Sequence, residues 1–171
     1  MSETAPPPPI FVHTQYVKDL SFEVPNAPHV FTTLRSQPQI NLGLDVRVQK
    51  LPPEGQGLFE VVLHLRAEAY EGTPPAPGEG RRGDGDETPK PVFIAELAYG
   101  GVFGLANVPE NAMEPVLLVE CPRLLFPFAR SILAEVTRDG GFPPMLLQPI
   151  DFVALWQQRR LQAAQQAAAT A

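Results

Sequence analysis

The sequence predicts an α+β fold, in which one four-stranded antiparallel sheet is followed by helices packed on one side of it. Three observations lead to this prediction. Up to about residue 102, apolar and polar side chains alternate as they do in strands. Helical spacing appears only after Pro109, and strands and helices do not alternate along the chain. With 171 residues, the chain has the length of one domain.

The composition favours a soluble globular protein and excludes several classes of function. Hydrophobic residues make up 44% of the chain and charged residues 19%, which is ordinary globular usage. A formal net charge of -6 argues against a nucleic-acid binder, because phosphate backbones are held by clustered lysine and arginine. The N-terminus lacks a leader-like pattern and no apolar run reaches about 18 residues, so we expect a cytoplasmic protein without membrane insertion.

The strongest local signals are those of two strands of the expected sheet. In "INLGLDVRV" (40–48) and "FEVVLHLRAEA" (59–69), apolar residues recur at every second position. The Pro- and Gly-rich "LPPEGQG" (51–57) lies between them and predicts an antiparallel hairpin. Segments 11–24 and 92–102 are predicted as two further strands, which are apolar on both faces.

The connection from 71 to 91 contains almost no apolar side chains, so burial would not offset the entropy lost on ordering it. We expect a flexible hairpin insertion; a charged docking loop built on Arg81 and Arg82 is the alternative. Residues 1–9 are expected to form a disordered Pro-rich tail, which leaves a single domain at 10–157.

Three helices are expected after Pro109. The first, "MEPVLLVE", is short and ended by Pro122. A second helix, closed by "DGGF", is predicted from apolar residues at helical spacing: Leu125, Phe128, Ile132 and Val136. The third begins after Asp151, a suitable N-cap, and its Ala- and Gln-rich end (158–171) has nothing to bury and is expected to fray.

Motifs of known enzyme classes are absent. The sequence has no P-loop, no zinc-protease or nucleophile-elbow signature and no CxxC pair. "YGGVFG" (99–104) lacks the lysine that would follow in a phosphate loop, which favours a bend or a close contact between strands. His13, His29 and His64 are scattered without metal-ligand spacing, and Cys121 is expected to be a packed thiol. No enzymatic activity, metal site or cofactor is therefore predicted.

Four long stretches carry a likeness that runs in order from about residue 11 to residue 156. They are "YVKDLSFEVPNAPHVF", "FIAELAYGGVFGLANV", "ECPRLLFPFAR" and "GGFPPMLLQPIDFVALW". In this order they closely resemble the SecB family of bacterial protein-export chaperones. The sequence departs from the family mainly in the N-terminal tail, the 71–91 insertion and the C-terminal end, where changes in length are tolerated.

The resemblance implies a function and partners. SecB-like proteins are tetramers, built as dimers of dimers, which would account for the surplus of apolar surface on segments 11–24 and 92–102 and on the helices. They bind unfolded precursor polypeptides without ATP, keep them competent for translocation and deliver them to the SecA motor. The resemblance therefore implies a homotetrameric chaperone of the Sec export pathway that needs no cofactor.

The resemblance also implies a docking surface for the basic, zinc-containing C-terminal tail of SecA. The matching residues are Asp19, Glu23, Ile94 and Glu96. Taken without the resemblance, the carboxylates of Asp19, Glu23 and Glu96 are typical of a solvated surface. Asp19 and Glu23 lie four residues apart and share one face of a strand, so a neighbouring strand could bring Glu96 beside them. The zinc belongs to the partner.

A client groove and an oligomer interface are implied in the same way. By position, the groove would contain Phe31, Leu34, Phe93, Phe126 and Phe128, for which ordinary core packing is the alternative. The interface would contain Ala95, Leu97, Tyr99 and Cys121. Family members often have Trp just before the "QP" at 37–38, whereas this chain has Ser36, so client preference does not follow from the resemblance.

Two other functions are alternatives to this one. SecB-like folds also serve as chaperones in toxin–antitoxin systems, although that role would not require acids for SecA docking. A small hydrolase that uses an unrecognised carboxylate pair is the third hypothesis, and the missing motifs count against it.

Overall fold

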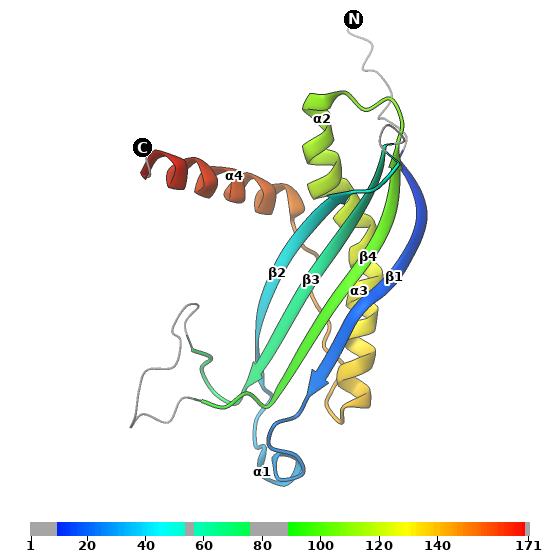
Figure 1. The fold of residues 1–171 in the computed structure, drawn as a ribbon. Coiled ribbons are helices and arrows are strands. Elements are labelled where there is room, and N and C mark those ends of the chain that lie inside the picture. Colours follow the sequence, from blue (N-terminus) through cyan, green and yellow to red (C-terminus); the bar gives the residue numbers. More distant parts are fainter. Residues whose placement is uncertain (1–9, 54–56, 76–88, 170–171) are drawn as a thin grey trace, which may run out of the picture.

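A computed structural model describes residues 10–53, 57–75 and 89–169 of the chain. Its centre is a four-stranded antiparallel sheet with the order β1-β4-β3-β2 (Figure 1). The strands are β1 (Ile10–Glu23), β2 (Gln39–Lys50), β3 (Leu58–Tyr70) and β4 (Phe93–Leu105). The predicted α+β class and the four strands are confirmed, and β4 extends three residues beyond its predicted end.

The predicted hairpin is the pair β2–β3. Leu44 lies opposite Leu65, and Leu42 lies opposite Ala67, so the alternating apolar residues of both strands share one face of the sheet. Most of the 71–91 insertion, with Arg81 and Arg82, lies outside the described residues, as does the tail at 1–9. The expectations for these two segments stay predictions.

The described residues contain more helical elements than the three helices predicted after Pro109. They are α1 (Val30–Thr33), α2 (Glu110–Pro115), the π-helix η1 (Val116–Glu120), α3 (Cys121–Asp139) and α4 (Phe152–Ala169). The expectation that a helix ends at Pro122 is wrong, since Pro122 lies in the first turn of α3. A wide π-turn immediately precedes this position and lets the chain accommodate the proline ring.

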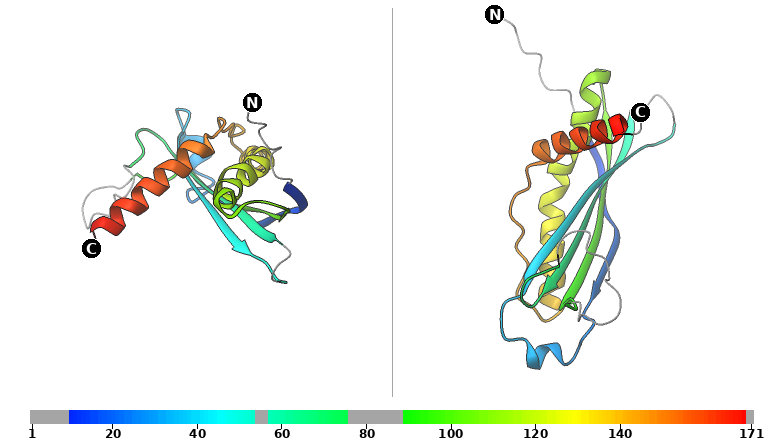
Figure 2. Two further views of the ribbon diagram at one scale, coloured as in Figure 1. Left: turned by 90° about the horizontal axis from the view of Figure 1, so that it is seen from above. Right: turned by 90° about the vertical axis from the view of Figure 1, so that its left-hand side faces the viewer.

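Helix α3 packs against one face of the sheet, and the described helices leave the opposite face, here called the outer face, largely open (Figure 2). The contact is closed by fully buried side chains: Leu63, Leu97, Phe103, Leu125 and Leu133. Gly101 lies beneath the helix, where an added Cβ would stand 3.0 Å from a methyl carbon of Leu125. The predicted apolar face of this helix is wrong at Phe128, which is 51% exposed, because the buried face is centred on Leu125, Ala129 and Leu133.

The end of α3 and the start of α4 follow standard capping rules. Gly141 has φ +90°, and Phe142 N–H donates to Thr137 O at 3.1 Å, which completes a Schellman motif. Asp151 accepts a 3.0 Å hydrogen bond from Ala154 N–H, as predicted for an N-cap. Helix α4 then projects away from the sheet (Figure 1). It is helical to Ala169 where a frayed end was expected, and residues 161–168 are exposed.

Strand β1 is tied across β4 to the buried Glu60 of β3. Lys18 Nζ lies 2.8 and 2.9 Å from the two carboxylate oxygens of Glu60, and the Tyr16 hydroxyl donates to the same group. Between them lies Gly100, where an added Cβ would stand 3.0 Å from the Tyr16 ring. The "YGGVFG" run is therefore a place of close contact, as predicted. The bond from Lys18 and the bond from Tyr16 keep the pKa of Glu60 below its usual value.

Replacing Glu60 by glutamine is expected to lower the free energy of unfolding by about 1–3 kcal/mol near neutral pH, because Lys18 loses its charged partner. The pKa of Glu60 in the fold lies below the usual 4.5, so this stabilisation is present above 4.5 and is lost as the pH falls through the folded value. Urea unfolding near neutral pH and at a pH below 4.5 should show a difference between wild type and E60Q that is smaller at the lower pH.

The control is E135Q, which removes an exposed carboxylate of α3. It should cost less than about 0.5 kcal/mol near neutral pH. A difference between wild type and E60Q that is the same at both pH values would contradict the assigned role of the Glu60 charge.

Candidate functional site

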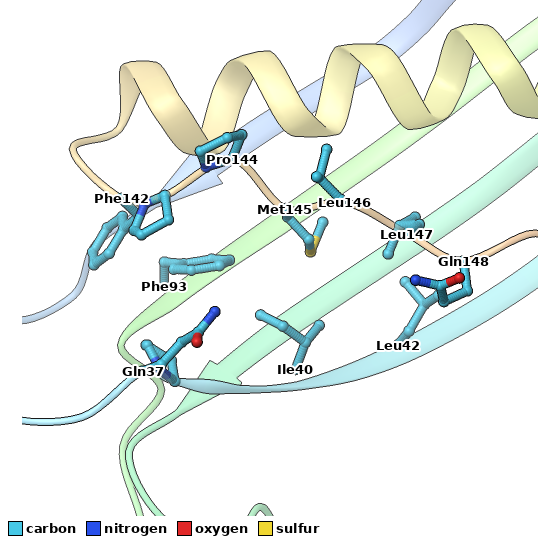
Figure 3. A pocket seen from close by; sticks show the side chains of 12 residues that line it. Gln37, Ile40, Leu42, Phe93, Phe142, Pro144, Met145, Leu146, Leu147 and Gln148 are labelled. Carbon is cyan, nitrogen blue, oxygen red and sulfur yellow. The ribbon is translucent and has the colours of Figure 1, made fainter.

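An apolar groove of about 410 Å³ lies between the edge strand β2 and the segment that joins α3 to α4 (Figure 3). We call this segment, residues 142–150, the crossover. From the sheet the groove is lined by Ile40, Leu42 and Phe93, and from the crossover by Phe142, Met145 and Leu147. Figure 3 shows Ile40, Phe93 and Met145 pointing into the same space.

The crossover is an extended strap. Its Pro143 and Pro144 disfavour a helix, and its side chains then alternate, with Met145 and Leu147 7% exposed and Leu146 67% exposed. The hydroxyl oxygen of Thr137, a fully buried residue of α3, accepts a 2.9 Å hydrogen bond from Met145 N–H and donates to Leu133 O. This buried bond holds the strap at a fixed distance from the helix and so helps to set the width of the groove.

One end of the groove is closed by a cluster of aromatic rings. The ring centroids of Phe93 and Phe142 lie 5.0 Å apart, and those of Phe31 and Phe142 lie 5.3 Å apart. Phe22 of β1 lies beside Phe93 with its centroid at 5.4 Å. Aromatic groups of this kind offer a large apolar contact area without a fixed hydrogen-bond pattern.

The five residues expected in the groove fall into three groups. Phe93 lines it, and Phe31 lies at its aromatic end with 51% of its surface exposed. Leu34 is half-buried in the small core that also contains Phe93 and Phe142. Phe126 and Phe128 do not line the groove: Phe126 is buried against Phe152, and Phe128 stacks on Tyr99 over the main core.

Helical and strand faces do not predict the groove residues of the crossover, such as Met145 and Leu147. The alternation in "PPMLLQPI" after a helix-breaking glycine pair was a signal for an extended strap with every second side chain inward. Gln37 and Pro38 also line the groove, so Ser36 immediately precedes groove-lining residues.

The acids expected in the docking surface lie together on the outer face. In the strand register, Ser21 is opposite Glu96, and its neighbours on the same face of β1 are Asp19 and Glu23. Ile94 lies opposite Glu23. Asp19 and Glu23 are exposed, and the Glu96 side chain is 42% exposed. The register therefore brings Glu96 beside the two β1 acids, an arrangement that their spacing in the sequence allowed.

A basic residue of the chain itself lies within this surface. Arg66 of β3 is opposite Glu96 in the register and forms an ion pair with it. The same guanidinium binds Glu68, with Nη2 at 2.6 Å and Nε at 2.9 Å from Oε1. Among the described residues, Asp19 and Glu23 form no such pair. The surface therefore combines two unpaired carboxylates with one that is already paired.

Helix α4 is anchored to strand β2 next to this surface by Arg159. Arg159 lies 2.7 Å from Asp45 Oδ1 and 3.2 Å from Leu44 O on β2. Burial opposes ionisation of Asp45, but the bonds from Arg47 and Arg159 outweigh it and lower its pKa. Burial, followed by the charge of Arg47, lowers the pKa of His64 on the neighbouring strand.

The residues expected at the oligomer interface lie inside the chain. Ala95 and Cys121 are 0% exposed, Leu97 is 2% and Tyr99 7%, and all four belong to the main core. The three β4 residues face α3, and Cys121 is the first residue of α3 itself. None of the four offers a surface for direct contact with a second subunit, and this part of the expectation is corrected. Burial, followed by the charge of Glu120, raises the pKa of the Cys121 thiol to about 12, as expected for a packed thiol.

Among the described residues, no group of three or more histidine, cysteine or acidic side chains is placed to hold a metal ion. Within the same residues, no helix is long and apolar enough to cross a membrane.

Comparison with known sequences identifies one family. The family described as preprotein translocase subunit SecB matches residues 3–163. The protein-export protein SecB of Granulibacter bethesdensis is 60% identical over 159 residues, covering 93% of this chain and 86% of that protein. The protein of the same name from Acidiphilium cryptum is 57% identical over 162 residues and covers 95% of both chains.

Comparison with solved structures supports the fold. The Rv1957 SecB-like chaperone of Mycobacterium tuberculosis, solved in complex with a ChAD peptide from the HigA1 antitoxin, matches with a TM-score of 0.59. The match covers 83% of this chain and 91% of that one at 13% sequence identity. At this identity, the likeness shows a shared fold alone.

Proposed function

The chain belongs to the SecB family and is a chaperone of the Sec export pathway, and we propose that it holds unfolded precursor polypeptides in the groove between β2 and the crossover. The observation that carries this proposal is the groove itself. It is apolar, it is closed at one end by aromatic rings, and its partly exposed side chains, such as Ile40 and Leu146, are available to a ligand.

The chemistry of the groove suits an unfolded chain. Such a chain exposes apolar side chains in many different orders, and a broad apolar groove binds them without requiring one sequence. Binding to the unfolded state shifts the folding equilibrium by mass action, so no nucleotide is needed. Strand β2 is at the edge of the sheet and adds unpaired backbone groups beside the groove.

We assign the second surface, around Asp19, Glu23 and Glu96, to docking of the SecA motor through its basic, zinc-containing tail. The support is the cluster of exposed carboxylates on the outer face, whereas the groove lies between β2 and the crossover. A basic partner would be attracted by this charge, and the attraction would weaken as salt screens it. Because the two surfaces are separate, docking would not require the client to leave first.

A homotetramer in the cytoplasm, a dimer of dimers, completes the proposal. Its support is exposed apolar surface on elements that the chain itself does not cover. On the edge strand β1, Phe11 is 55% and Val17 46% exposed, and on α3 Phe128 is 51% exposed. These exposed residues replace the buried Ala95, Leu97, Tyr99 and Cys121 as the expected contact surface.

The toxin–antitoxin alternative has less support. The structural match to the Mycobacterium tuberculosis protein is at 13% identity, whereas relatives named for protein export are 57–60% identical. The acids expected for SecA docking are present and lie together, which favours the export function. We propose that the protein carries out no catalysis of its own.

Replacing Ile40 by glutamine should weaken binding of an unfolded precursor by roughly fivefold, because about 1 kcal/mol of apolar contact is lost in the groove. The matched control is V48Q, since Val48 lies on the same face of the same strand, is 37% exposed against 39% for Ile40, and lies outside the groove. Affinity for a denatured precursor, and suppression of its aggregation without nucleotide, would be measured. Equal loss in both variants would contradict the groove assignment.

Combining Asp19→Asn with Glu96→Gln should weaken binding of SecA by about tenfold at low salt and less at high salt, because two charges are lost from the docking surface. Binding of the precursor should stay near normal. The control combines E135Q with D139N, which removes two acids from the exposed side of α3. If precursor binding fell together with SecA binding, the two acids would have a structural role instead.

A further inference from the structure

The ion pair between Arg66 and Glu96 is the feature of the docking surface that the sequence did not predict. Arg66 projects from β3 on the outer face, and its guanidinium contacts two carboxylates, those of Glu68 and Glu96. The Arg66 side chain is 52% exposed, and that of Glu96 42%. A basic partner that approaches Glu96 therefore meets a cation already bound there.

We propose that Arg66 is an internal competitor that lowers the affinity of the docking surface and raises its selectivity. This inference rests on the proposed docking of SecA at these acids. A weakly basic segment cannot displace Arg66 from Glu96, so it forms ion pairs only with Asp19 and Glu23. A segment with several closely spaced cations pairs with all three carboxylates, because one of its cations can take the place of Arg66 beside Glu96.

The geometry permits such an exchange without leaving Arg66 unpaired. Arg66 contacts Glu68 through Nε and Nη2 and Glu96 through Nη1, so the contact to Glu68 can persist when Glu96 turns to the partner. Glu68 is fixed in turn by a 3.0 Å hydrogen bond from the Tyr70 hydroxyl. An exposed ion pair is weak, so the exchange costs little and the competition is reversible.

The test compares the binding of purified SecA to wild type, R66Q and R47Q by titration at low and at near-physiological salt. R47Q is the matched control: Arg47 lies on the same face of the sheet, is paired with Asp45 and contacts none of the docking acids. R66Q should bind about two- to fivefold more tightly than wild type, and the gain should exceed that of R47Q at both salt concentrations. A gain of equal size in R47Q would overturn the proposal, since it would reflect net charge alone.

A double-mutant cycle with E96Q makes the assignment specific. If Arg66 competes for Glu96, the gain from R66Q should disappear when Glu96 is already neutral. A gain that persists in the double variant, or weaker binding by R66Q, would overturn the competitor role. Failure of the docking proposal gives a different result, in which wild type binds SecA no better than the variant that combines D19N with E96Q.

A second readout tests the selectivity. Binding of a peptide with one isolated lysine should rise in R66Q by a larger factor than binding of a peptide with four adjacent lysines, because only the second can displace Arg66 from the wild-type surface. The opposite order would contradict the proposed selectivity. Precursor binding serves as the check on folding and should be unchanged in R66Q.

Discussion

The contact between α3 and one face of the sheet is the constraint on which the other features depend. Side chains such as Leu63, Leu97 and Leu125 have no exposed surface or almost none, and Gly101 allows the helix to approach the backbone closely. Helix α3, together with η1, the crossover and the start of α4, covers this face, while the described helices leave the outer face largely open. The proposed docking surface can therefore be built from charged strand residues without disturbing the core.

The same contact determines where the groove lies. Helix α3 ends at Asp139 near α1, whereas α4 begins at Phe152 at the opposite end of the sheet, so the connecting segment must run back along the sheet beside β2 (Figure 1). The Schellman motif at Gly141 turns the chain, and the bond to Thr137 holds the strap in place. A return segment held in this way leaves a long apolar space next to an edge strand, which suits an extended ligand.

Much of the fold could be predicted from the sequence, because alternation along β2 and β3 and the caps at Gly141 and Asp151 are local signals. The path of the chain at Pro122 could not be predicted in this way, because the preceding π-helix lets the chain stay helical through a proline that would otherwise end a helix. For the site, spacing placed Asp19 and Glu23 on one face, but the pairing of Arg66 with Glu96 depends on strand order. The burial of Ala95 and Phe126 likewise depends on which face α3 covers.

The central claim is that one assembled chaperone holds its client and its motor on separate surfaces. Native mass spectrometry of the protein mixed with an unfolded precursor and SecA tests this most directly, because each complex is weighed with its composition intact. The account predicts an assembly of about four times the 18.7 kDa chain that carries precursor and SecA together. Complexes that contain either precursor or SecA but never both, or a chaperone that remains a monomer, would contradict it.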